Sequence, residues 1–407
     1  MIERGARLTL DIEKPAAGGR MLARHAGQVV LVTGTIPGER VSAVVDRVGK
    51  GVVFADTEEV LTASPDRRPA AADWRCGGNV FSHIAYPRQL QVKAAIIRDG
   101  FTRIGRLPLP DLPPVAGSPE TGYRMRARLH VQGSRIGFFR EGTHQLCDAA
   151  ATGQFLPATT DWIAAAARQL HERGLDAALS IELSENIPGD RRAAYIELPP
   201  GIDPSPYREL MAGPTEVVDV ISVGNGASLT LTRDVRAFFQ ANRFLIASLV
   251  EHVVGLAGSG PVIDLYAGVG LFGLAVAARG NQEVIAVEGD PFSGSDLVRN
   301  AQPFTPRVTV HQQSVESFLG SASARQLRRS QPAFIVDPPR TGMTREALGG
   351  IINQDPPRIV YVSCDVATLA RDARTLVDAG YELESLAGMD LFPNTAHVEA
   401  IALFVRG

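Results

Sequence analysis

Two short apolar runs in the last quarter of the chain end abruptly in polar and turn-forming residues. Residues 334–336 lead into Asp337 and two prolines, and residues 361–362 lead into a Ser-Cys-Asp sequence that contains Cys364. Runs of this kind are typical of buried strands in a parallel sheet. Because ligands bind outside the carboxyl ends of the strands in open α/β sheets, we expect Asp337 and Cys364 to meet at one edge.

An earlier stretch predicts a nucleotide-binding turn. An apolar run around Asp264 enters a Gly-x-Gly turn at Gly268 and is followed by a predicted helix over residues 271–278. The next predicted strand, residues 284–287, ends at Glu288. Glycines let the backbone approach a ligand closely, and an acidic residue about 20 positions further on accepts ribose hydroxyls.

Short alternating segments with glycine turns occupy the amino-terminal part of the chain. They predict strands over residues 8–12, 28–32, 40–45 and 52–54. Closely spaced strands of this type favour a small barrel. Residues 64–69 then predict a linker.

The middle of the chain has a mixed pattern. A helix is expected over residues 160–173, capped by Asp161 or a nearby threonine. Strands are expected over residues 178–184, 193–198 and 216–223. This pattern therefore predicts an α+β accessory domain, in which we identify no candidate catalytic residues.

Arginines alternate with apolar residues at the start of this middle region. A strand through Arg124, Arg126 and Arg128 would place all three side chains on one face, and Arg140 follows. A basic, partly aromatic face suits RNA. A solvated strand face is an equally good interpretation.

Cys364 and Glu399 are candidates for covalent and acid–base chemistry. Cys364 precedes a predicted helix, whose amino-terminal dipole would stabilise a thiolate. Glu399 lies between Val398 and Ala400, and partial burial would raise its pKa towards the range of a useful base. The alternative for Cys364 is an inert core cysteine.

Composition narrows the class of protein. The 407 residues suggest two or three domains, and 45% hydrophobic with 21% charged residues is ordinary globular composition. No apolar run approaches the ~18 residues of a membrane span, and the first residues lack a signal-peptide layout. Three distant cysteines argue against a disulfide framework and favour a reducing cytoplasm. The net charge of −3 neither indicates nor excludes a local RNA-binding face.

Ordered motifs along nearly the whole chain resemble the RNA uracil-C5 methyltransferase family. The amino-terminal glycine turns, Gly18-Gly19 and Pro37-Gly38-Glu39, look like its TRAM barrel. The remaining matches are Phe238-Phe-Gln-Ala-Asn242, Asp264-Leu-Tyr-Ala-Gly268, Val287-Glu288, Val336-Asp-Pro-Pro-Arg340, Val362-Ser-Cys-Asp365 with Thr368-Leu-Ala-Arg-Asp372, and His397-Val-Glu399.

The resemblance implies three domains and a Rossmann-like α/β methyltransferase fold. The expected units are a small OB-like TRAM barrel at residues 1–62, a central RNA-binding α+β domain at residues 63–232 and the methyltransferase domain at residues 233–407. Residues 84–115 could pack on the methyltransferase domain.

The same resemblance implies site residues and ligands. Cys364 is the expected nucleophile towards C6 of uracil, and Glu399 is the expected base. S-adenosylmethionine is the expected cofactor, and its site would be lined by Gln240, Tyr266, Gly268, Glu288 and Asp337. The expected substrate is structured RNA, with 23S rRNA favoured over tRNA. We expect no membrane association and no obligate protein partner. The sequence does not determine the oligomeric state, for which a monomer is only the default.

The chain departs from the family pattern at several positions. Some family members hold an iron–sulfur cluster with four cysteines, whereas here Cys76 keeps one position, Asn79 stands at another and Cys147 is displaced. We therefore expect no cluster and no other metal. Leu271 and Ser314 replace residues that are usually polar or acidic near the cofactor.

Two other kinds of function stay open. The methyl acceptor could be cytosine C5 or an exocyclic amine, and amine methylation would leave Cys364 and Glu399 idle. Alternatively, the protein could be an RNA-binding protein or folding factor with a degenerate cofactor site.

Overall fold

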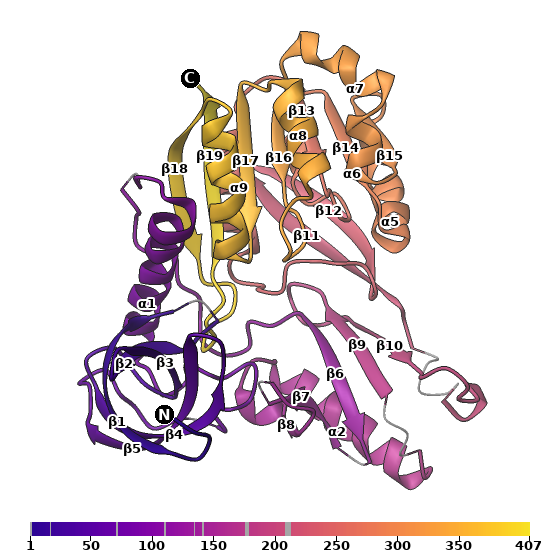
Figure 1. Ribbon diagram of the computed structural model, residues 1–407. Helices are drawn as coiled ribbons and strands as arrows, with labels where there is room; N and C mark the ends of the chain where they lie inside the picture. Colours follow the sequence, from indigo (N-terminus) through magenta and orange to yellow (C-terminus); the bar gives the residue numbers. More distant parts are fainter. Residues whose placement is uncertain are drawn as a thin grey trace.

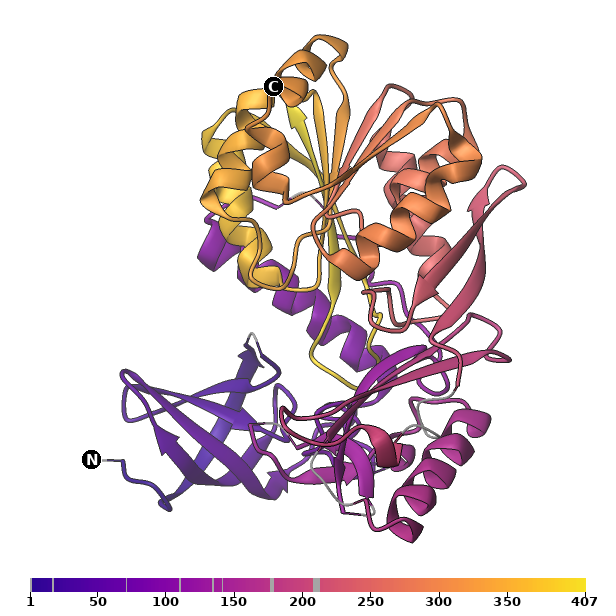
Figure 2. The same ribbon diagram turned by 90° about the vertical axis from the view of Figure 1, so that its right-hand side faces the viewer.

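The computed structural model describes residues 2–16, 18–70, 72–109, 111–133, 135–140, 142–175, 179–207 and 213–407. Figures 1 and 2 show a large sheet with its helices on one side of the molecule and a small barrel and a second sheet on the other. None of the helices within the described ranges is long and apolar enough to cross a membrane.

A closed barrel forms the amino-terminal part, as predicted. Its strands are paired in the order β1-β2-β3-β5-β4. The alternating pattern buries Leu8, Leu10 and Ile12 inside the barrel. The bounds are β1 (Arg7–Pro15), β2 (Met21–His25), β3 (Gln28–Thr33), β4 (Arg40–Val48) and β5 (Val52–Thr62).

The central region is built on a five-stranded sheet with the order β10-β9-β6-β7-β8. Its strands are β6 (Arg126–Gln132), β7 (Arg135–Phe139), β8 (Leu146–Asp148), β9 (Leu179–Glu185) and β10 (Arg192–Glu197). The expected strands near 179 and 193 are thus present, although residue 178 lies outside the described residues.

The helix of this region, α2 (Pro157–Glu172), starts earlier than predicted. Its N-cap residue is Leu156 and no side chain caps it, so the expectation of a cap at Asp161 or a nearby threonine was wrong. Pro157 explains the start, because proline suits the first helical position and has no N–H to satisfy.

Cys76 and Cys147 form a disulfide, with Cα atoms 5.7 Å apart. This corrects the sequence argument against disulfide bonding. The two cysteines are separated by 71 positions. The fold brings them together because the Cys76 segment pairs with residues 139 and 140 at the end of β7, and Cys147 lies on the neighbouring strand β8.

A two-stranded ribbon, β11 (Glu216–Gly224) and β12 (Ala227–Asp234), leads into the large domain. The large sheet has the order β15-β14-β13-β16-β17-β19-β18. Its parallel strands are β13 (Val262–Leu265), β14 (Val284–Glu288), β15 (Val308–Gln312), β16 (Ala333–Val336) and β17 (Arg358–Ser363). The antiparallel pair β18 (Tyr381–Met389) and β19 (Glu399–Arg406) completes it.

Helices lie on both faces of this sheet (Figure 2). They are α3 (Ile246–Ala257), α4 (Gly273–Arg279), α5 (Pro291–Ala301), α6 (Val315–Leu319), α7 (Ala322–Leu327), α8 (Arg345–Gln354) and α9 (Val366–Asp378). One helix from the amino-terminal half, α1 (Tyr86–Asp99), contacts both β1 of the barrel and β18 of the large sheet. The π-helix that follows it, Gly100–Gly105, packs against α9.

Candidate active site

A cavity of about 880 Å³ opens where the parallel strands of the large sheet end. It receives residues that follow β13, β14, β16 and β17, and also residues from β6 and β7 of the central sheet. Every predicted catalytic and cofactor residue lines it: Cys364, Glu399, Gln240, Tyr266, Gly268, Glu288 and Asp337.

The glycine turn after β13 forms one end of this cavity. Tyr266 and Gly268 have φ angles of 60° and 57°, in the left-handed region, so the chain turns sharply at the strand end. The carboxylate of Glu288 accepts hydrogen bonds from the N–H groups of Gly268 (2.7 Å) and Asp290 (2.6 Å). These bonds tie the end of β14 to the turn.

Asp264 supports the same turn from beneath. One carboxylate oxygen accepts a hydrogen bond of 2.7 Å from the N–H of Gly273, at the start of α4. The carboxyl group is fully buried, and burial raises its pKa to about 8. A Cβ at Gly273 would lie 2.8 Å from this carboxylate, so only glycine fits there.

Cys364 and Glu399 are cross-strand neighbours. β17 and β19 pair antiparallel, and their last paired residues are Ser363 and Ala400. The next position on each chain is Cys364 and Glu399. Because opposite residues of paired strands have Cβ atoms about 5 Å apart, this register places thiol and carboxyl group side by side.

The pKa of the Cys364 thiol is raised, which corrects the expectation of a thiolate stabilised by the dipole of α9. Burial raises this pKa to about 12, and the nearby carboxylates of Glu399 and Asp337 act in the same direction. The N–H groups of Ala367 and Thr368 at the start of α9 donate to the Asp365 side chain. They are therefore occupied by a helix cap.

The two carboxyl groups beside Cys364 also have raised pKa values. Burial raises the pKa of Asp337 to about 7, while a hydrogen bond from Gln240 Nε2 to Asp337 Oδ2 (3.2 Å) opposes the rise. Burial, followed by the charge of Asp337, raises the pKa of Glu399 well above its usual range. Like charges in one buried site favour protonated forms.

Arg340 and His397 belong to the site but were given no role from the sequence. Arg340 Nη2 lies 2.8 Å from His397 Nδ1. Burial and the guanidinium group lower the pKa of His397 to about 4, so its ring is neutral and accepts this hydrogen bond. Arg340 also favours the thiolate form of Cys364. The sequence did contain a signal for the role of Arg340, because this residue follows shortly after Asp337 on the same loop at the end of the strand.

The predicted arginine row divides between the cavity and the surface around it. Arg124, Arg126 and Arg128 line the cavity next to the aromatic residues of β7. Arg124 lies over the rings of Phe138 and Phe392. Arg140 does not line the cavity.

Acidic residues already pair with most of these arginines. Arg126 and Arg128 face carboxylates of β9 and β10, namely Glu182 and Glu197. Arg140 pairs with Asp73 at 2.7 Å.

The two unusual positions near the cofactor loop have ordinary structural roles. Leu271 is buried and lines the cavity. Ser314 is the N-cap of α6, where its hydroxyl accepts a hydrogen bond of 3.2 Å from the N–H of Ser317.

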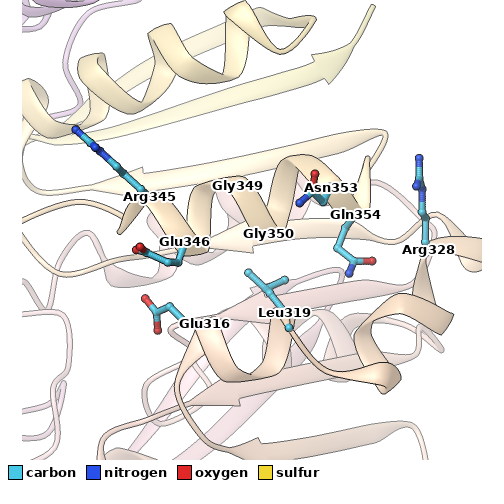
Figure 3. Close-up of a pocket in the computed structure, with 10 residues that line it drawn as sticks. Glu316, Leu319, Arg328, Arg345, Glu346, Gly349, Gly350, Asn353 and Gln354 are labelled. Atoms are coloured by element: carbon cyan, nitrogen blue, oxygen red, sulfur yellow. The ribbon is translucent and has the colours of Figure 1, made fainter.

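A second cavity of about 720 Å³ lies between α6 and α8, with Glu316 and Glu346 on its two sides (Figure 3). Its lining consists of residues from α6, α8 and the segment after α7, and it includes none of the predicted site residues.

Two family models match the chain. A model of the tRNA (uracil-5-)-methyltransferase family matches residues 209–406, and a model of the TRAM domain matches residues 2–57. The second match confirms the interpretation of the amino-terminal barrel.

Relatives align over almost the full length. The 23S rRNA (uracil(1939)-C(5))-methyltransferase RlmD of Halomonas elongata is 31% identical over 446 residues, which cover 99% of this chain and 91% of the relative. RlmD of Chromohalobacter salexigens is 34% identical over 434 residues, with coverage of 98% and 89%.

One solved structure has the same overall fold. It is the Pyrococcus abyssi tRNA (uracil-54, C5)-methyltransferase in complex with S-adenosyl-L-homocysteine, with a TM-score of 0.73 and 22% sequence identity, covering 97% of this chain and 99% of the other. Its likeness confirms the expected Rossmann-like α/β architecture. With the family-model matches and the full-length relatives, the motifs and geometry lead to one conclusion: this chain belongs to the RNA uracil-C5 methyltransferase family.

Proposed function

We propose that this protein transfers a methyl group from S-adenosylmethionine to C5 of a uridine in structured RNA, through a covalent bond between Cys364 and C6 of the base. The observation that carries the proposal is the register of β17 and β19, which brings a thiol and a carboxyl group together in one cavity. A purely RNA-binding protein has no need of this pair.

The thiol answers a specific chemical difficulty, because C5 of uracil is a weak nucleophile. When Cys364 Sγ bonds to C6, the electrons of the C5=C6 double bond move towards O4, and C5 becomes electron-rich. The guanidinium group of Arg340 favours the sulfur anion that must form first. Amine methylation would require neither the sulfur nor Glu399.

Glu399 completes the cycle. After C5 carries the methyl group, its hydrogen must leave as a proton. The Glu399 carboxylate accepts this proton, the C–H electrons restore the C5=C6 bond, and the bond between C6 and Sγ breaks to release Cys364. A raised pKa makes this carboxylate, once ionised, a stronger base than an exposed one.

The other end of the cavity fits the adenosyl part of the cofactor. The turn at Gly268 has no side chain within 4 Å of the place a Cβ would occupy, so it leaves open space. Glu288 at the end of β14 suits ribose hydroxyls, and Tyr266 lines the same cavity. S-adenosylmethionine, when bound, would supply an electrophilic methyl group.

The target uridine must leave its stack to reach Cys364, which costs a few kcal/mol and is easiest in a loop or other unpaired segment. We favour 23S rRNA as the substrate, because both full-length relatives above carry that specificity in their names. Mapping 5-methyluridine in total RNA from a deletion strain would identify the target, and a missing methyl group in tRNA instead would overturn this choice.

Two variants test the covalent route. We expect Cys364→Ala to lose methyl transfer to RNA completely, because no bond to C6 can form. We expect Glu399→Gln to accumulate a cysteine–RNA adduct, because the C5 proton stays in place. Denaturing gels with labelled RNA detect the adduct, and nucleoside analysis identifies the product. Methylation by Cys364→Ala would contradict the covalent route.

A further inference from the structure

The loop that carries the proposed base is held by side chains from a distant part of the chain. Residues 390–398 connect β18 to β19 and end next to Glu399. Phe392, Thr395 and His397 of this loop line the cavity. Several contacts that hold the loop come from α1, near the amino-terminal barrel (Figure 1). Arg68, Tyr123 and Asn242 also donate hydrogen bonds to the loop.

Lys93 of α1 forms the central contact. Its ammonium group donates hydrogen bonds to the Asp390 carboxylate and to the backbone oxygen of Phe392 (3.0 Å). The side chains of Lys93 and Asp390 are both completely buried. Lys93 thus holds the start of the loop at two positions, Asp390 and Phe392.

Gln89, one turn earlier on α1, fixes the middle of the loop. Its amide donates to Asn394 Oδ1 (2.8 Å) and accepts from the N–H of Asn394 (2.9 Å). Asn394 has a φ angle of 64°, so the chain turns in the left-handed region there. Arg68 donates a second hydrogen bond to Asn394 Oδ1, at 3.0 Å.

Stability alone does not explain a buried charged pair at this place. Burial lowers the pKa of Lys93 and raises that of Asp390, so each charge is disfavoured by its surroundings. Replacing such a pair with apolar residues of similar size is often neutral or stabilising. Apolar residues would not provide directional contacts. Hydrogen bonds fix the position of the loop backbone, whereas dispersion contacts do not.

We propose that Lys93 is a positioning residue, which holds the 390–398 loop through Asp390 and Phe392 so that Glu399 faces the methylated C5 of the uridine. This inference rests on the proposed function. It adds a residue of the amino-terminal half to the machinery of proton removal.

The decisive variant replaces the pair by apolar residues, Lys93→Met with Asp390→Leu. We expect its melting temperature to match that of the parent, whereas Lys93→Met alone melts lower because it leaves an unpaired buried carboxylate. We also expect the double variant to lose at least tenfold in kcat, with KM for RNA within twofold. Its cysteine–RNA adduct should persist on denaturing gels, since proton removal is the slowed step.

Two controls separate an effect on the position of the 390–398 loop from an effect on the stability of the fold. Asp390→Asn keeps the shape and an acceptor for Lys93, so it should retain more activity than Lys93→Met. Arg67→Met disturbs the pair between Arg67, in the segment after the barrel, and the fully buried Glu39 of the barrel, and should lower the melting temperature without changing kcat. It shows what destabilisation alone does.

A double variant with parental kcat would overturn the proposal, as would a loss of kcat in Arg67→Met equal to that in Lys93→Met. If the double variant does not fold, the comparison of Asp390→Asn with Lys93→Met decides, and equal activities refute the role of the hydrogen bonds. If the parent protein itself methylates no uridine, the proposed function is refuted. That result differs from a parent and a double variant that are equally active, which refutes only the positioning role of Lys93.

Discussion

The thiol of Cys364 shares a buried space with two carboxyl groups, and this governs its reactivity before RNA arrives. Burial and negative neighbours both oppose the thiolate, so the resting cysteine holds its proton. Arg340 acts in the opposite direction, as a positive charge beside the sulfur. A thiol that holds its proton reacts slowly with oxidants and alkylating agents, so we expect the proposed nucleophile to be unreactive until a substrate fills the cavity.

Arg340→Met should therefore slow the alkylation of Cys364 by iodoacetamide in the RNA-free protein. Loss of the positive charge raises the thiol pKa, and below that pKa the thiolate fraction falls in proportion. Because Arg340 is exposed and screened by solvent, we expect a decrease of roughly threefold at pH 9. Mass spectrometry of the peptide that contains Cys364 measures the rate.

Arg374→Met is the matched control for this measurement. Arg374 lies on α9, and its guanidinium pairs with Asp378 at the far end of the helix. Its replacement should leave the alkylation rate unchanged. Faster alkylation in Arg340→Met would show that access, and not charge, limits the reaction.

Among the elements, α9 fixes the chain immediately after Cys364, the proposed nucleophile. Asp365 Oδ1 accepts hydrogen bonds from Ala367 (3.0 Å) and Thr368 (2.9 Å). Removing such a cap costs about 1 kcal/mol, so Asp365→Ala should lower the free energy of unfolding by that amount. Urea denaturation measures it, and Asp365→Asn, which keeps the acceptor, should stay within a few tenths of the parent. Equal losses in both variants would mean that the charge matters and the cap does not.

Local patterns predicted the elements that bury one face or end at the sheet edge. Alternation located most barrel strands, but it missed β2, where Met21, Leu22 and Ala23 are all buried in succession. A strand with two covered faces has no alternation to read. The cap of α2 was misplaced because Leu156, at its N-cap, has no side-chain acceptor.

The proposed catalytic pair shows the limit of such reasoning. Asp337 and Cys364 could be placed from sequence, since each follows a parallel strand. The pairing of Cys364 with Glu399 depends on the register of an antiparallel strand that returns after a long loop. That register depends on the pairing of segments that are distant in the sequence, which no local pattern contains. The disulfide of Cys76 with Cys147 was missed for the same reason.

At the scale of the whole molecule, attraction to RNA must be local, because the net charge is −3. The cavity faces the central sheet, and Arg126 and Arg128 lie at that side of it. Both arginines are already paired with carboxylates of β9 and β10. RNA phosphates would have to compete with these carboxylates, so the acidic residues are expected to weaken binding.

The pair Arg128–Glu197 offers a test in both directions, because the two side chains are 54% and 52% exposed and neither supports the core. Arg128→Gln should weaken RNA binding and reduce the slope of log affinity against log salt by about 0.7 to 0.9, the amount for one lost phosphate contact. Glu197→Gln should tighten binding a few-fold at low salt, because it removes the closer of the two carboxylates that pair with Arg128, and the other, Glu182, lies 3.8 Å away. Filter binding over a range of salt concentrations measures both effects. If Arg128 is only a solvent-exposed residue of the strand face, neither variant changes the slope of log affinity against log salt. The RNA must then approach Cys364 from another side.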